Sequence, residues 1–145
     1  MVNKTIDAVI ASLYKEFGDE YTYTDEQSEQ GLEGKTFLVS MIKPTSHGGF
    51  WNTHNRVMPI VVYYFPNDTL NPRSECYSIG ERALEAVNII EIESVKVSGK
   101  DLEIQLVDNV LQIFATYDFW TKDLGSDTDD DKMEQVENET KLDNE

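Results

Sequence analysis

Four side chains in the sequence could in principle do chemistry: two histidines, the single cysteine, and one aspartate among aromatic residues. His47 and His54 are seven residues apart, but a zinc site needs a third ligand of comparable placement, and the cysteine is distant in sequence. Cys76 lies on the apolar side of an expected helix with no nucleophile motif around it, so we expect a buried, inert thiol. The sequence therefore predicts no metal site and no cofactor.

Asp118 is the one carboxylate expected among large apolar neighbours, since Tyr117, Phe119 and Trp120 surround it. A carboxylate in such a place needs a hydrogen-bond donor, so we expect a hydrogen-bonded aspartate near a strand end. The sequence has no nucleophile elbow, phosphate-binding loop or zinc-protease motif. We therefore predict that the protein is not an enzyme. A small enzyme with a site around Asp118, His47 or His54 stays as a less favoured hypothesis.

Two amphipathic helices are expected to hold these residues in place. The first covers residues 6–17, where apolar side chains recur at helical spacing, with Asn3 or Thr5 as N-cap and Gly18 as C-terminal cap. The second covers residues 71–88, with Asn71 as N-cap and Pro72 as its first residue. Its apolar side includes small residues, which would let it approach a sheet closely. Strands are predicted at residues 21–24, 36–43, 56–66, 89–98, 102–106 and 110–121, with turns at residues 98–101 and 108–109.

The central strand is predicted at residues 56–66, because β-branched and aromatic residues are concentrated there. It is apolar on both faces, so each face should be covered. Pro59 has no N–H to donate, so we expect a bulge or an unpaired edge near Met58 and Pro59, with full pairing from Ile60 onward. Residues 110–120 are its expected neighbour.

The fold class that follows is α+β, a mainly antiparallel sheet of about five to six strands with two helices packed on one face. A single domain is expected over residues 1–121. Residues 122–145 hold ten acidic residues, three lysines and no aromatic residue, so we expect a disordered acidic C-terminal tail.

The net charge of −16 constrains the partners. Residues 1–121 carry −9 of it, which argues against direct binding to nucleic acid phosphates. No run approaches the roughly 20 apolar residues of a membrane span, and the first residues lack a signal-peptide core. We expect a soluble protein that is intracellular where it is made.

Residues 45–55 are expected to form a loop or a hairpin into the central strand. Phe50 and Trp51 stand there beside two glycines, and Arg56 follows. Aromatic residues and arginine are favoured at interface hot spots, so these three are the candidate oligomer or partner interface. The alternative is that Phe50 and Trp51 fold back onto the core.

Three blocks of sequence together resemble a family of bacteriophage tail terminators found in phages and defective prophages of Gram-positive bacteria. They are Thr-Phe-Leu-Val-Ser-Met-Ile-Lys-Pro at residues 36–44, Asn-Arg-Val-Met-Pro-Ile-Val-Val-Tyr-Tyr-Phe-Pro at 55–66, and Val-Asp-Asn-Val-Leu-Gln-Ile-Phe-Ala-Thr-Tyr-Asp-Phe-Trp at 107–120. With the two helices in the expected order, the resemblance covers about residues 1–121. The acidic extension has no counterpart in it.

The resemblance implies a structural role in the virion tail, with assembly in the host cytoplasm. Such proteins close the tail tube at its final length, commonly as a hexameric ring, and meet the head connector or neck protein. It implies no enzyme activity, no cofactor and no membrane. DNA would pass through the ring without specific binding, and an acidic lumen would repel its phosphates. The competing hypothesis is an acidic inhibitor or nucleic-acid mimic, which would require the tail for function.

Overall fold

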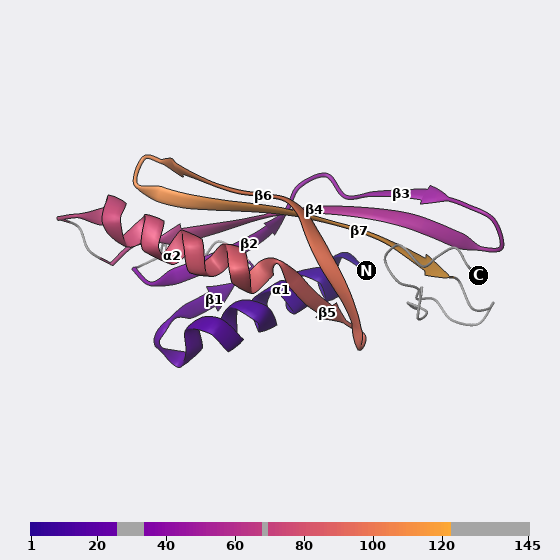
Figure 1. Cartoon of the computed structure of the whole chain (residues 1–145), viewed down its shortest axis with the longest axis horizontal. Coiled ribbons are helices and arrows are strands. Elements are labelled where there is room, and N and C mark those ends of the chain that lie inside the picture. The colour runs from indigo at the N-terminus through magenta and orange to yellow at the C-terminus, as the bar shows by residue number, and fades with distance from the viewer. Residues whose placement is uncertain (26–33, 68–69, 123–145) are drawn as a thin grey trace.

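Two helices pack against one face of a curled sheet in the computed structural model, which describes residues 1–25, 34–67 and 70–122 (Figure 1). The elements in order are α1 (Val2–Phe17), the short 3-10 helix η1 (Gly18–Glu20), β1 (Thr22–Thr24), β2 (Thr36–Met41), β3 (Thr45–Gly48), β4 (Thr53–Phe65), α2 (Pro72–Val87), β5 (Ile89–Ile92), β6 (Val95–Val107) and β7 (Val110–Lys122). Among the described residues, no helix has the length and apolar character to cross a lipid bilayer.

The sheet order is β1-β2-β4-β7-β6-β5, and β3 pairs with β4 beyond the end of β2. All pairs are antiparallel except β1 with β2. The predicted α+β class with two helices is therefore confirmed, and the sheet is mixed because of the one parallel pair. β4 and β7 form its centre, in register from Thr53 opposite Lys122 to Tyr64 opposite Leu111, so the predicted neighbour of the central strand is also confirmed.

Both predicted helices are present, but the predicted start of α1 is wrong. α1 begins four residues earlier than predicted, so Thr5 lies inside the helix, where its hydroxyl donates to the Met1 carbonyl at 2.9 Å instead of capping. Gly18 ends α1 with φ +83°, a conformation that glycine adopts without strain. α2 begins at Pro72 as predicted. A Cβ at Gly80 would lie 3.0 Å from Ile104, so the helix approaches the sheet closely there.

The core lies between the helices and the inner face of the sheet. Alternate residues of β4 and β7 face it, as the two-residue period of a strand requires. An aromatic cluster closes the end near β1, where Phe37 lies 4.9 Å between ring centroids from both Phe17 and Tyr64. The buried inner-face residues of the two central strands are Met58, Ile60, Val62, Tyr64, Leu111, Ile113, Ala115, Tyr117 and Phe119.

The irregularity predicted near Met58 and Pro59 is present on one side of β4, where neither residue has a register partner and pairing with β2 runs from Ile60, but it is absent on the β7 side. Pro59 stands in register opposite Thr116 of β7 within an unbroken ladder. Its carbonyl accepts from Ile42 N at 2.8 Å, so its N–H position faces the β2–β3 side, because both backbone groups of a strand residue point to the same neighbour. On that side β2 ends at Met41 and β3 starts at Thr45, with one extra residue between the two registers. The irregularity is therefore in the partner strand, where no N–H of Pro59 is needed.

The predicted turn at residues 98–101 is wrong. The hairpin turns instead at Glu93 and Ser94, both left-handed at φ +52° and +71°, and β6 then continues through Gly99. A Cβ at Gly99 would lie 3.3 Å from the Val87 carbonyl oxygen, and Gly99 N donates to the Asn88 carbonyl at 2.6 Å. The glycine thus permits a close backbone approach to the end of α2. A register shift between Lys100 and Glu103 bends the strand just beyond it.

The two faces of the central strand differ in their cover. The helices cover the inner face, and no described helix lies on the outer face, where Leu38 and Val61 are nonetheless buried among their neighbours. β7 continues to Lys122. Residues 123–145 of the tail predicted for residues 122–145 lie outside the described residues, so the disordered tail stays a prediction.

Candidate assembly surface

One end of the sheet extends past both helices as a three-stranded arm, which we define as residues 45–57 and 118–122 (Figure 1). β4 supplies its middle strand, β3 one edge and the end of β7 the other. On the β7 side, pairing with β6 among the described residues stops at Tyr117, because β6 bends away at Gly99. The arm is therefore built by the long central strands and carries no helix. Sequence analysis allowed a loop or a hairpin here, and the hairpin is correct.

The tip of the arm is a two-residue turn that exposes two aromatic rings. Thr53 N donates to the Phe50 carbonyl at 3.1 Å, and Trp51 and Asn52 between them are both left-handed, at φ +59° and +61°. This is the type I′ geometry that matches the twist of a hairpin. Phe50 and Trp51 are 82% and 83% exposed, so they do not fold back onto the core. A tryptophan in this backbone conformation is strained, and strain of this kind gathers at functional sites.

Replacing Trp51 by asparagine should stabilise the isolated protein. Asparagine tolerates the left-handed conformation and is preferred in type I′ turns, so Trp51→Asn should raise the free energy of unfolding by about 1 kcal/mol. Urea denaturation followed by circular dichroism measures it. Phe50→Asn is the matched control, because Phe50 is equally exposed but does not have positive φ, and it should give no such gain. A loss of stability in Trp51→Asn would mean that the indole supports the fold.

Trp120 adds a third aromatic ring to the arm. A Cβ at Gly49 would lie 2.8 Å from the Trp120 ring, so the ring packs directly on the backbone of the glycine. Any larger residue at Gly49 would push the ring away. Trp120 keeps 37% of its surface exposed. The aromatic surface of the arm thus includes a residue that sequence analysis did not select as an interface candidate.

Arg56 lies in the paired strands of the arm, which we call its shaft, and not at the tip with Phe50 and Trp51. It pairs with Phe119 in register, and its Nε donates to Thr121 Oγ1 at 2.9 Å. Partial burial lowers the pKa of its guanidinium from the ordinary value. The three candidate interface residues therefore fall into two places: an aromatic tip and an arginine held against the shaft.

The other residues considered for chemistry do not converge. His47 pairs with Asn55 and His54 with Gly48, so the two imidazoles occupy successive rows and point to opposite faces of the arm. Asp118 accepts from Asn55 Nδ2 at 2.7 Å and pairs with Lys100 Nζ at 3.3 Å, which confirms the expected hydrogen-bonded aspartate. Cys76 is fully buried on the helix face that meets the sheet, as predicted, and burial raises the pKa of its thiol.

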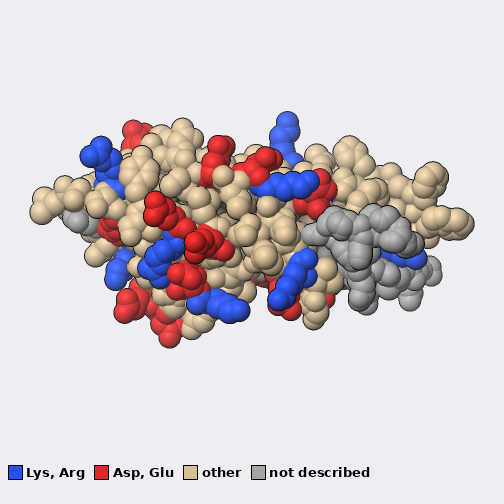
Figure 2. Space-filling view, in the orientation of Figure 1, with Lys and Arg blue, Asp and Glu red and all other residues tan. Residues whose placement is uncertain are grey.

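The arm belongs to the least acidic part of the chain. Residues 34–67 contain Lys35, Lys43 and Arg56 and no aspartate or glutamate, so they carry +3. The other residues of 1–121 hold eighteen acidic and six basic side chains and so carry −12. In Figure 2 the charged side chains gather over the helices and the β5–β6 hairpin, while the visible surface toward the free end of the arm shows no red. The molecule is therefore electrostatically divided along its length.

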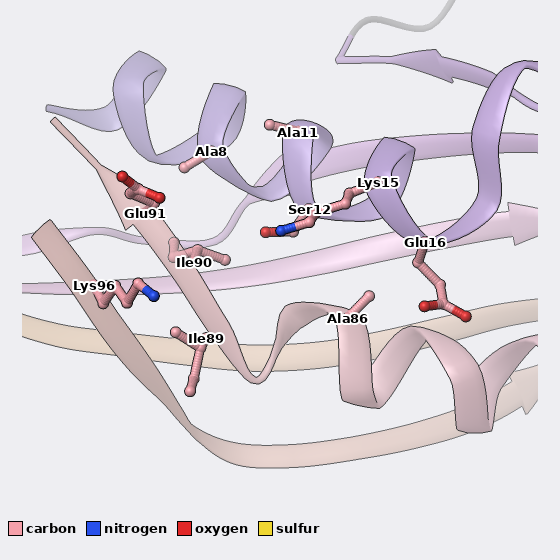
Figure 3. A pocket seen from close by; sticks show the side chains of 10 residues that line it. All are labelled: Ala8, Ala11, Ser12, Lys15, Glu16, Ala86, Ile89, Ile90, Glu91 and Lys96. Carbon is pink, nitrogen blue, oxygen red and sulfur yellow. The ribbon is translucent and has the colours of Figure 1, made fainter. Parts of the chain in front are cut away.

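A groove of about 580 Å³ opens on the helix side, between α1, α2 and the β5–β6 hairpin (Figure 3). Small side chains make the room: Ala8, Ala11 and Ser12 from α1 and Ala86 from α2. The two strands contribute Ile89, Ile90, Glu91 and Lys96, and Ile89 is 49% exposed. Sequence analysis missed this groove. The signal was the run of small residues at positions i, i+3 and i+4 of the first helix, which leaves one helix face without bulk.

The comparisons with known proteins give one informative match. A family model for phage tail terminator protein matches residues 4–131. No curated protein sequence matches significantly. One solved structure aligns over 83% of this chain and 97% of its own length, at 11% identity and a TM-score of 0.38, and a similarity this weak carries no argument.

Proposed function

This chain belongs to the phage tail terminator family, and from that membership we propose that it caps the tail tube at its final length as a hexameric ring and forms the interface for head attachment. The family gives the protein a structural role as a component of the virion tail. The ring, the capping and the head contact are the parts that we propose. Its partners would be further copies of itself, the tail tube protein, and a head–tail connector or neck protein.

The family match is the observation that carries the proposal, because it spans the arm, α2, the seven described strands and all of α1 except its first two residues. The arm supports the ring in particular. It extends beyond the helices and exposes two large aromatic rings that the monomer does not use. Exposed aromatic side chains of this size, next to polar residues, are typical of interaction sites. We therefore assign Phe50, Trp51 and Arg56 to the ring or partner interface.

The distribution of charge supports passage of DNA through the ring without specific binding. A lumen formed by carboxylate-rich surface would repel phosphates and let the duplex slide. With −12 on residues 1–33 and 68–121, most of the surface outside the arm region has the required sign.

The test is a tube-capping assay with the full chain and the tail tube protein of the same phage. The wild-type chain should bind the ends of tubes and stop their growth, seen as shorter tubes of uniform length by electron microscopy. Trp51→Ala should stay folded, because its side chain is exposed, but should lose ring formation and capping. Tyr77→Ala is the control, a 44% exposed aromatic on α2 far from the arm, and it should cap normally.

Two outcomes would count against the proposal. Tubes that keep growing in excess wild-type chain would exclude the capping role. A folded Trp51→Ala variant that assembles and caps like wild type would remove the aromatic tip from the interface. Native mass spectrometry of capped ends gives the number of copies in the ring.

A further inference from the structure

We propose that the arm tip of one copy, Phe50 and Trp51, inserts into the groove between α1, α2 and β5 of the next copy. The inference rests on the proposed ring and names the two surfaces that join its subunits. The tip and the groove are different surfaces of the same chain. A contact of this kind is heterologous, and repeated around an axis it closes into a ring.

The groove has the volume and the apolar lining that an aromatic hairpin tip needs. Its volume of about 580 Å³ lies within the range of sites that enclose small molecules. The helices contribute small side chains at Ala8, Ala11 and Ala86, and Ile89 offers an exposed apolar surface. An aromatic ring placed there would cover apolar surface on both partners.

The polar groups of the groove also fit an aromatic guest. Lys15 and Lys96 extend from opposite sides of the groove, from α1 and β6 (Figure 3). An ammonium group within about 6 Å of a ring face is attracted to its π electrons, most strongly for tryptophan. The indole N–H needs an acceptor when it is buried, and Ser12 and Glu91 line the same groove. The groove therefore offers acceptors for the indole N–H and cations for the face of the ring.

Charge complementarity identifies the guest as a second copy. The arm holds Arg56, Lys122 and Asp118 and so carries +1, and residues 48–52 at its tip have no charged side chain. The three elements around the groove, α1, α2 and β5, hold six acidic and four basic residues. Two of those bases are already paired, Lys4 with Glu93 and Arg82 with Glu16. An arm of net charge +1 is attracted to elements of net charge −2, whereas two such groups of elements or two arms repel each other.

The geometry excludes the same contact within one chain. Residues 53–57 of β4 carry the tip beyond the helices, a length of about 17 Å at the usual strand rise. The strands on both sides of β4 keep this part of the arm in regular register. In Figure 1 the tip points away from α1 and α2, so the tip of a chain cannot enter the groove of that same chain.

Cross-linking between two single-cysteine variants tests the contact. Gly48→Cys places a thiol beside the tip, where a Cβ meets no neighbouring atom, and Ala11→Cys places one on the exposed wall of the groove. Under assembly conditions with a short bismaleimide, the mixture should give a covalent dimer of one Gly48→Cys chain and one Ala11→Cys chain. The buried native Cys76 should not react, so wild type should give no product. Gly48→Cys mixed with Gln105→Cys, which lies on the outer sheet face, is the matched control and should give none.

A pair of disabling variants tests the direction of the contact. Ala11→Phe fills the groove with a large side chain, and Trp51→Ala removes the indole that would enter it. Each variant alone should therefore weaken self-association at least tenfold. Mixed together, they should form dimers through one intact junction and no rings. Intact rings without the cross-link from Gly48 to Ala11 would overturn this inference and leave the proposed function standing. A wild-type chain that never forms rings, even on tube ends, would overturn the proposed ring and this inference together.

Discussion

Phe37→Ala should lower the free energy of unfolding by about 3–5 kcal/mol, the usual cost of truncating a fully buried phenylalanine. Phe37 has no exposed surface and contacts four other aromatic rings: Phe17, Tyr21, Tyr23 and Tyr64. These rings join α1, β1, β2 and β4, so the cavity would open where four elements meet. Domains of this size are stable by only about 5–15 kcal/mol, so the loss is a large share.

Equilibrium denaturation in urea measures this change. Phe50→Ala is the matched control, because it truncates the same residue type at a position that is 82% exposed, and it should stay within about 0.5 kcal/mol of wild type. A Phe37→Ala cost as small as that of the control would mean that the aromatic cluster does not form. Phe37→Leu should recover much of the loss, because it keeps most of the buried apolar volume.

Stability should fall steeply above pH 10, because two buried tyrosines hold their protons in the folded state. Tyr64 and Tyr117 have no exposed surface, and burial raises the pKa of each well above its ordinary value of 10. Each hydroxyl also donates a hydrogen bond at 2.5 Å, Tyr64 to Glu75 and Tyr117 to the Val87 carbonyl. Ionisation would remove these hydrogen bonds and place a charge in the core.

The direction of the change in stability with pH follows from the difference in proton binding between the folded and unfolded chains. Above pH 10 the unfolded chain loses both protons while the folded chain keeps them, so the stabilisation is complete below pH 10 and is lost as the pH rises. The slope is about 1.4 kcal/mol per pH unit for each group, or about 2.7 for the two. Tyr23, whose pKa burial raises to about 12, adds to the loss in the same direction.

Urea denaturation at a series of pH values from 9 to about 12 gives the slope. Tyr117→Phe should reduce it by about half, while costing about 1–3 kcal/mol at neutral pH because the Val87 carbonyl loses its donor. Tyr77→Phe removes a phenol that is 44% exposed and should leave the slope as in wild type. A stability that stays flat from pH 9 to 12 would show that these phenols are not held protonated.

Much of the fold followed from local sequence patterns. The period of apolar residues gave both helices, and the alternation in residues 110–121 gave the buried face of β7. The glycine after α1 and the proline at the start of α2 act through their own backbone preferences, so their positions were predictable without knowledge of the neighbours. Phe50 and Trp51 were expected on a loop or a hairpin, because the paired glycines before them favour a turn, and the structure has the hairpin.

The failures come from neighbours that are distant in sequence. Gly99 has the composition of a turn, but it serves a close contact with the end of α2, and the turn formed at Glu93 and Ser94. The irregularity predicted at Met58 and Pro59 is present only on the β2–β3 side, because the extra residue is in that partner strand and the ladder with β7 is unbroken. The groove forms only where α1, α2 and the β5–β6 hairpin come together, so the sequence of any one of these elements does not predict it.

The sequence by itself determined the α+β class, the family and the division of charge between an acid-free stretch and an acidic remainder. The charge is a sum over residues, and the fold class and family follow from short-range sequence patterns. Neither depends on where a residue lies in the folded molecule. Only the tertiary structure decided that residues 45–57 and 118–122 form an arm without helices, that its tip exposes Phe50 and Trp51, and that a groove opens between α1, α2 and β5. The physical reason is that exposure depends on what packs against a side chain, and β6 leaves the arm because of its bend at the end of α2.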